Sequence, residues 1–321
     1  NMVPLMEWKM QKGIDTKLVN TSETGTSSIQ IKAYIQNEYD SGDLGYVLLV
    51  GDGPQIPIPS GGSDPMYSLL AGSDSYPDIF VGRFSAEDAT QVATQVQRSI
   101  RYERDVPGGE AWMQQGMGVA SNQGPGDDGE YDNEHEDVIR QKLLDYGYLT
   151  VDQIYDPTGT AAMVANGLNA GRGIINYTGH GSTTSWGSTG FSNTNVNALV
   201  NDDMLPFICS VACNNGTFTS TTCFAEAWLR ATNGGTATGA VACYMSYISQ
   251  SWDPPMCAQD AAIDLLVDDE KRTIGGLWFN GSCQMMDEYG SAGINEFENW
   301  TIFGDPSLRV RTKAPAVASV D

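Results

Sequence analysis

Basic residues are scarce in this sequence. Seventeen lysines and arginines stand against forty aspartates and glutamates, which gives a formal net charge of −23 at pH 7. A chain this acidic is repelled by nucleic acid and by anionic membrane surfaces, whereas cationic substrates are drawn to it. We therefore expect no nucleic-acid partner.

Long apolar runs are also missing. No stretch approaches the roughly 18 apolar residues that cross a membrane, and the opening residues NMVPLMEWKMQKG lack the basic start and the cleavage site of a signal peptide. We expect no membrane span and no secretory signal within this chain.

Two common cysteine and histidine patterns are absent. The six cysteines, at positions 209, 213, 223, 243, 257 and 283, include no CxxC pair, and the two histidines form no HExxH motif. These absences argue against a zinc ribbon, a thioredoxin-like redox site and a zinc peptidase. Structural disulfides are compatible with the pattern, particularly in an extracellular protein.

The rest of the chain alternates short apolar runs with amphipathic segments. A buried strand is predicted at 46–50 (YVLLV), and a helix is predicted to begin near Ser85. Strands and helices alternate again after residue 112. The pattern predicts an α/β protein of two lobes with mostly parallel central sheets flanked by helices. We expect an N-terminal subdomain at 1–108, a second subdomain at 109–312 and a tail at 313–321.

One histidine and one cysteine follow predicted strands. His180 lies between glycines in GIINYTGHGSTTSWG, and Cys213 ends PFICSVAC. The carboxyl ends of parallel strands gather functional groups, so the two side chains meet if the strands are neighbours. An imidazole would then assist thiolate attack on a carbonyl, with the Gly181 and Cys213 amides as oxyanion donors. The residues alone favour a plainer interpretation, a buried cysteine and a tight loop.

Eight segments carry a family resemblance. They are YVLLVGD, FVGRFS, RYERD, INYTGHGSTTSWG, LPFICSVACNNGTF, CFAEAWLRA, GTATGAVACYMSYISQSWDPPM and FGDPSLRVR. In this order and at this spacing they resemble segments of the gingipain family of cysteine peptidases, which belongs to the caspase-like clan. The resemblance covers roughly residues 5–312. It implies a caspase-like catalytic domain and an endopeptidase without an organic cofactor.

The resemblance assigns roles by matching motif. It implies that Cys213 is the nucleophile and that His180 is the general base and acid. The family places an acidic residue behind the histidine, but the matching position in VASNQG is Gln123. A glutamine can orient the imidazole but cannot stabilise its charged form, which implies a Cys-His dyad. Asp127 or Asp128 could take the third role instead.

The resemblance also implies a pocket for a basic side chain. Asp132 matches the aspartate that pairs with arginine in arginine-specific gingipains, and Trp252 and Met256 match residues that line the pocket. A carboxylate that binds a guanidinium through two hydrogen bonds favours arginine, while Asp253 keeps lysine as the runner-up. Composition alone gives Asp132 no distinction, because it is one of seven acidic residues at 127–137.

Three further expectations concern the surroundings of the site. His135 is expected to be exposed or to cap a helix. The resemblance suggests structural calcium, with oxygen ligands from Asp74 and Asp78 or from the 127–137 loop. Related first lobes open with an apolar strand that is not found before Asn1, which suggests an upstream segment that is removed or stays associated as a separate chain.

These observations favour one function over two others. The favoured function is a secreted or cell-surface cysteine endopeptidase, matured by proteolytic processing, that cleaves protein or peptide substrates after basic residues. The alternative is a calcium-dependent binding or adhesion module on a caspase-like scaffold, with its chemistry weakened by Gln123. A metal hydrolase built on the acidic loop ranks third because it lacks a known ligand spacing.

Overall fold

The computed structural model describes residues 1–106 and 110–314. Eight strands form one central sheet in the order β1-β2-β12-β11-β8-β5-β3-β4. Their bounds are β1 (Tyr46–Val50), β2 (Phe80–Phe84), β3 (Gln115–Ala120), β4 (Thr150–Tyr155), β5 (Ile174–Thr178), β8 (Phe207–Val211), β11 (Ala242–Ser246) and β12 (Trp300–Phe303). Neighbouring strands are parallel except β11 and β12, which are antiparallel. The sheet therefore reverses direction once.

Helices connect these strands. The α-helices in the described residues are α1 (Val3–Gln11), α2 (Thr21–Thr24), α3 (Ser28–Ser41), α4 (Ala89–Arg104), α5 (Asp132–Tyr146), α6 (Ala161–Asn169), α7 (Asn193–Val196), α8 (Phe224–Arg230), α9 (Asp253–Val267), α10 (Ile274–Tyr289) and α11 (Ser291–Glu298). Two short hairpins, β6 (Gly181–Ser182) with β7 (Ser185–Trp186) and β9 (Thr232–Asn233) with β10 (Thr236–Ala237), lie outside the main sheet.

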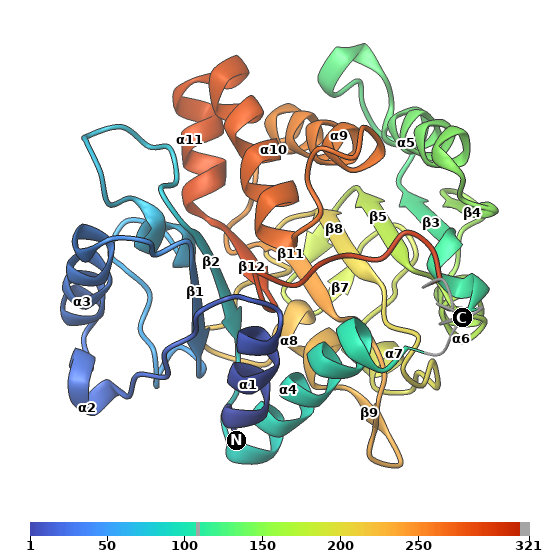
Figure 1. The fold of residues 1–321 in the computed structure, drawn as a ribbon. Coiled ribbons are helices and arrows are strands. Elements are labelled where there is room, and N and C mark those ends of the chain that lie inside the picture. The colour runs from blue at the N-terminus through green and yellow to red at the C-terminus, as the bar shows by residue number, and fades with distance from the viewer. Residues whose placement is uncertain (107–109, 315–321) are drawn as a thin grey trace, which may run out of the picture.

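Alternate side chains of the central strands enter two separate cores. On β5, Ile174 packs into one core, and Ile175 and Tyr177 pack into the other, as the two-residue period of a strand requires. Strands β5, β8 and β11 are buried along their whole length, so their sequences are continuous apolar runs. Helices α5, α9 and α10 cover the first face, and α6, α7 and α8 contribute to the second (Figure 1).

Buried charged side chains fasten the N-terminal part of the chain to the rest. Arg83 on β2 donates two hydrogen bonds of 2.6 Å to Asp64. Lys9 on α1 lies 2.9 Å from Glu103 on α4 and 2.5 Å from Asp305, which follows β12. Breaking a buried pair leaves an uncompensated charge and is strongly destabilising. The Lys9 pairs therefore hold α1, α4 and the segment after β12 together, and the Arg83 pair holds β2 against the segment that contains Asp64.

The predicted fold class is confirmed, because a mostly parallel sheet is flanked by helices on both faces. The strand at 46–50 has its predicted bounds. The helix predicted from near Ser85 begins instead at Ala89, so that start was wrong. Asp88 sets the start, since its side chain accepts the N–H groups of Thr90 and Gln91.

The predicted subdomain boundary stays a prediction. Residues 107–109, where the segments 1–108 and 109–312 meet, lie outside the described residues, as do residues 315–321 of the predicted tail. Strands from both predicted lobes nevertheless share one sheet, because β12 pairs with β2 on one side and with β11 on the other.

Two compositional expectations can be compared with the structure. All six cysteines are free, so the compatible disulfides are not formed. Within residues 1–106 and 110–314, no helix has both the length and the apolar character that a membrane crossing requires.

Candidate active site

His180 and Cys213 follow adjacent strands. Strands β5 and β8 are parallel neighbours with Thr178 opposite Val211, and the Gly179 N–H donates to the Val211 carbonyl at 3.1 Å. Both chains therefore leave the sheet at the same edge. His180 and Cys213 line one surface hollow together with Gly179, Ala212 and the loop 250–252. The convergence expected from the sequence is present.

Cys213 is only partly exposed in this hollow. Its Sγ lies 3.7 Å from the carbonyl oxygen of Gln250, which it contacts as a weak donor. Burial raises the pKa of the Cys213 thiol above its usual range because desolvation disfavours the thiolate. The free thiol form is therefore favoured until a proton acceptor is brought to it.

The His180 ring has two defined neighbours. Its Nε2 lies 2.8 Å from the Oε1 atom of Gln123, and its ring meets Trp252 edge-on at 5.1 Å between centroids. An amide oxygen only accepts, so this hydrogen bond places the imidazole proton on Nε2 and leaves Nδ1 with a lone pair. Gln123 thus occupies the orienting position, whereas Asp127 accepts a hydrogen bond from Tyr289.

The backbone N–H groups of Cys213 and Gly181 are the candidate oxyanion donors. The Cys213 N–H donates to no carbonyl within the described part of the chain. Gly181 and Trp186 form a non-hydrogen-bonded pair of the β6–β7 hairpin, since the Gly187 N–H bonds to the His180 carbonyl at 2.7 Å. A side chain at position 181 would meet the Cys213 carbonyl oxygen at 2.6 Å. Only glycine lets the two segments approach this closely.

Asp132 is the first residue of α5 and is fully buried. One carboxylate oxygen accepts a short hydrogen bond from the Ser121 hydroxyl, and the other accepts one from Trp252 Nε1 at 3.1 Å. Burial raises the pKa of Asp132, although these two hydrogen bonds oppose the shift. Each oxygen keeps a second acceptor position, but Asp132 does not itself line the hollow and reaches it through Trp252.

The remaining predicted pocket residues, Met256 and Asp253, lie on α9 near Trp252. Met256 is fully buried on α9, and a side chain at Gly126 would collide with Met256 and with Trp252. A side chain at position 126 would therefore displace the Met256 side chain and press on Trp252. Asp253 is the first residue of α9, one residue after Trp252, and is partly exposed.

The expectation for His135 was wrong. Its side chain is fully buried, with Nδ1 3.0 Å from Glu130 and Nε2 3.0 Å from Gln259. Asp260 lies 3.4 Å from the same Nδ1. Burial lowers the pKa of His135, but the Glu130 hydrogen bond and the Asp260 charge outweigh it and raise that pKa to about 9. Two polar partners for the ring nitrogens make this interior position possible.

A buried polar network extends from His135 to β5. Gln259 on α9 accepts hydrogen bonds from His135 and from Thr178 at 2.9 Å, and Thr178 also lies 3.0 Å from Glu136. Burial raises the pKa of Glu136 to about 8, so this side chain favours its neutral form. The network joins α5, α9 and the strand that leads to His180. The sequence gives no signal for it, since its members are far apart in the chain.

One group in the described ranges has metal-ligand geometry. The ligand atoms of Glu130, His135 and Asp260 lie within 4.8 Å of one another. Asp74 and Asp78 are placed elsewhere, in a surface loop where Asp74 accepts the Tyr76 N–H and Asp78 accepts two backbone N–H groups at 2.7 Å. The loop itself therefore already uses these two carboxylates.

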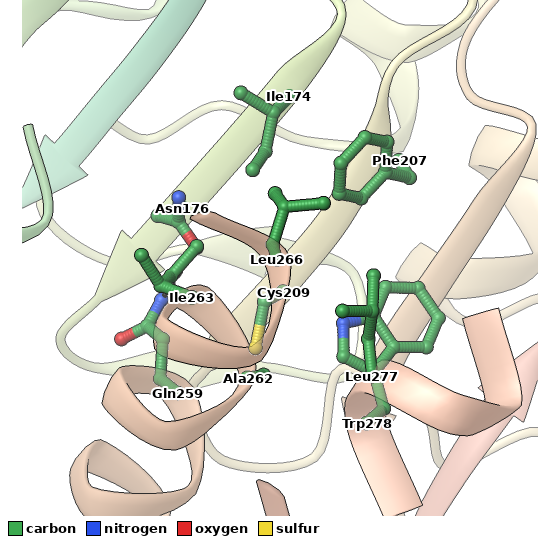
Figure 2. Close-up of a pocket in the computed structure, with 10 residues that line it drawn as sticks. All are labelled: Ile174, Asn176, Phe207, Cys209, Gln259, Ala262, Ile263, Leu266, Leu277 and Trp278. Atoms are coloured by element: carbon green, nitrogen blue, oxygen red, sulfur yellow. Dashed lines mark hydrogen bonds between the residues drawn. The ribbon is translucent and has the colours of Figure 1, made fainter. Parts of the chain in front are cut away.

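A second hollow, inside the protein, is unsuited to chemistry. Figure 2 shows it between the central strands and helices α9 and α10, with largely apolar walls that include Phe207 and Trp278. Cys209 lies on its wall, and full burial raises the pKa of that thiol far above its usual range. The hollow contains neither His180 nor Cys213, so we interpret it as a gap in core packing.

Sequence reasoning missed one contact at the site. Glu296 on α11 is buried and accepts hydrogen bonds from the Ser251 N–H at 2.9 Å and from the Ser251 hydroxyl at 2.7 Å. Ser251 lies between Gln250 and Trp252, which both line the hollow. No motif marks Glu296, because its position depends on how α11 packs beside the loop.

Comparisons with known proteins find similar sequences over most of the chain. The model of the family described as Peptidase family C25 matches residues 1–311. Gingipain R2 of Porphyromonas gingivalis is 41% identical over 329 residues, covering 98% of this chain and 45% of the relative. Lys-gingipain of the same species is 28% identical over 220 residues, covering 62% of this chain and 12% of the relative. The chain thus spans less than half the length of these curated relatives.

Solved structures show the same similarity. The crystal structure of the Arg-specific cysteine proteinase gingipain R superposes with a TM-score of 0.96 at 40% identity, covering 98% of this chain and 76% of that one. A complex of the pro- and mature domains of a P. gingivalis peptidase superposes with a TM-score of 0.96 at 39% identity, covering 98% and 78%.

Proposed function

The chain belongs to peptidase family C25, and we propose that it is a cysteine endopeptidase that cleaves after basic residues, with arginine preferred over lysine. The observation that carries this proposal is the shared hollow, which His180, Cys213 and Trp252 line, with the buried Asp132 behind it as the hydrogen-bond acceptor of Trp252. We propose these residues as nucleophile, base and cation-binding carboxylate of one site. The name of the matched gingipain R structure supports the preference for arginine.

The proposed reaction begins with proton transfer from the Cys213 thiol to His180 Nδ1. The thiolate attacks the substrate carbonyl carbon, and the N–H groups of Cys213 and Gly181 stabilise the oxyanion. His180 then protonates the leaving amine, the peptide bond breaks, and a thioester remains on Cys213. Water, deprotonated by His180, hydrolyses the thioester and restores the free thiol.

Gln123 would orient His180 during this cycle. Its amide oxygen, 2.8 Å from Nε2, fixes the tautomer that leaves Nδ1 free to accept the thiol proton. A neutral amide adds no charge stabilisation to the imidazolium. A thiol ionises far more readily than a serine hydroxyl, so a Cys-His dyad is chemically sufficient.

Substrate selection is proposed to depend on Asp132. Its two carboxylate oxygens match the paired N–H groups of a guanidinium, whereas an ammonium is a point charge without this planar fit. Trp252 and Met256 would pack along the apolar stem of the bound side chain. Asp253 remains the candidate for a lysine preference.

Structural calcium is the cofactor that the resemblance implies, and the metal-ligand group of the described residues fits it poorly. One of the three donors at Glu130, His135 and Asp260 is an imidazole, whereas calcium takes six to eight oxygens. Asp74 and Asp78 already accept backbone N–H groups, and their role as calcium ligands stays a prediction. No step of the proposed reaction passes through a metal.

We also propose that the peptidase acts outside the cell or at its surface and matures by cleavage of its precursor. The complex of a relative's pro- and mature domains supports processing. The binding-module alternative is not favoured, because the intact Cys213 and His180 lie together in the hollow.

The proposal is tested with fluorogenic peptides that end in Arg, Lys or Ala, assayed with and without calcium beside a Cys213→Ala variant. We expect turnover after Arg that is lost in the variant. Turnover after Lys alone would indicate that Asp253 recognises the basic side chain of the substrate. Absence of turnover in a folded protein with a reactive thiol would contradict the proposal.

A further inference from the structure

The loop 247–252 is attached to two separate parts of the protein. On one side the Asn214 N–H donates to the Ile248 carbonyl at 2.8 Å, and its side chain donates to the Ser249 hydroxyl at 3.0 Å. On the other side Glu296 of α11 accepts both hydrogen bonds that Ser251 donates. The turn after Cys213 therefore holds the first half of the loop, and α11 holds Ser251.

Ser251 is flanked by the two loop residues that touch functional groups. The carbonyl of Gln250 contacts the Cys213 sulfur at 3.7 Å. Trp252 donates to Asp132 at 3.1 Å and lies edge-on to His180. A shift of Ser251 would displace both neighbours, and with them the wall of the arginine pocket.

A buried carboxylate at this place has a cost. Glu296 is 4% exposed, and no cation is paired with it among the salt bridges of the described residues. Its charge also adds to the effect of burial that raises the pKa of Cys213. A buried charge is expensive unless it is well hydrogen-bonded. The two hydrogen bonds from Ser251 in the loop 247–252 offset the cost of burying the Glu296 carboxylate.

We propose that Glu296 is a positioning residue, which fixes Ser251 and thereby sets Trp252 against Asp132 and Gln250 against Cys213. The proposal deepens the proposed peptidase function and rests on it for its kinetic readout. Glu296 touches neither substrate nor reacting atoms. It acts through the geometry of the loop, whose residues 250–252 line the hollow.

The test compares Glu296→Ala with Glu296→Gln. Alanine leaves both Ser251 donors without their acceptor, so KM for the Arg peptide should rise at least about tenfold while kcat falls less. Glutamine keeps an oxygen that can accept both hydrogen bonds, so it should restore KM to within about threefold of the unchanged protein. Glu298→Ala is the matched control on the same helix, since its carboxylate makes neither contact.

A second readout does not depend on turnover. Hydrogen exchange of the 247–252 amides should accelerate in Glu296→Ala and stay slow in Glu296→Gln and Glu298→Ala. Unchanged exchange and unchanged KM in Glu296→Ala would overturn the proposal, as would a Glu296→Gln variant that is folded yet as impaired as the alanine variant. If the unchanged protein cleaves no Arg peptide, the peptidase function fails, and the exchange rates alone decide whether Glu296 holds the loop.

Discussion

Asp132→Asn isolates the charge that we assign to arginine recognition. Asparagine has nearly the same shape as aspartate, and both of its polar atoms find partners in the present site. Its oxygen can accept from Trp252 Nε1, and its nitrogen can donate to the Ser121 hydroxyl, which is able to accept. The fold should therefore tolerate the change. Because burial raises the pKa of Asp132, removal of the charge should leave thermal stability equal or higher.

The expected loss follows from the hydrogen bonds that disappear. Each carboxylate oxygen of Asp132 has one acceptor position left, and a hydrogen bond to a charged group contributes about 1.5–3 kcal/mol. Asparagine keeps one acceptor oxygen, so one of these bonds disappears, which gives a loss of about 1.5–3 kcal/mol, or roughly tenfold to 10²-fold in kcat/KM on an Arg peptide. A peptide ending in citrulline, the neutral isostere of arginine, should lose much less.

The assay is the ratio of kcat/KM for the Arg and citrulline peptides, measured for both proteins with the melting temperature as a control for folding. The ratio should fall by at least about tenfold in Asp132→Asn. A folded variant that keeps the original ratio would refute the assignment. In that case Asp253→Asn, measured with the same two peptides, becomes the informative substitution.

Three further predictions concern the catalytic groups and the fold. Gln123→Glu should raise kcat about threefold to tenfold, because a carboxylate stabilises the His180 imidazolium although solvent screens it; an unchanged kcat would restrict position 123 to orientation. Gly181→Ala should lower kcat by more than about tenfold in a folded protein, since its methyl group meets the Cys213 carbonyl at 2.6 Å; a normal kcat would remove Gly181 from the oxyanion site. The pKa of His135 is raised to about 9 from 6.5 in the unfolded chain. This shift stabilises the fold by about 3 kcal/mol below pH 6.5, and the stabilisation is lost as pH rises through 9. Urea denaturation that shows no such decline, or the same decline in His135→Gln, would contradict this.

From the residues alone, the meeting of His180 and Cys213 could be predicted only on the condition that their two strands are neighbours. Continuous apolar runs mark buried parallel strands, and polar residues after such strands gather at one sheet edge. The strand 46–50 was predictable on the same basis. The strand prediction uses only neighbouring residues, whereas the meeting of the two side chains also required the strand order, which the family resemblance implied.

The rest depended on contacts between distant segments. The burial of His135 follows from Gln259 and Asp260 on α9, more than 100 positions away along the chain. Glu296 reaches Ser251 only because α11 packs beside the loop. Likewise, β12 lies in the sheet between β2 and β11. A local sequence pattern does not indicate which two strands a distant segment pairs with.

The place of β12 in the sheet imposes an order on biosynthesis. A ribosome completes His180 and Cys213 many residues before it reaches Trp300–Phe303, so β2 and β11 wait with unfilled edges while the nucleophile already exists. Helix α11, whose Glu296 binds Ser251 in the loop 247–252, is also synthesised after Cys213. If the chain is the peptidase that we propose, a nascent chain would carry the Cys213 thiol before its pocket is finished, and cleavage of substrates would begin only after β12 has entered the sheet.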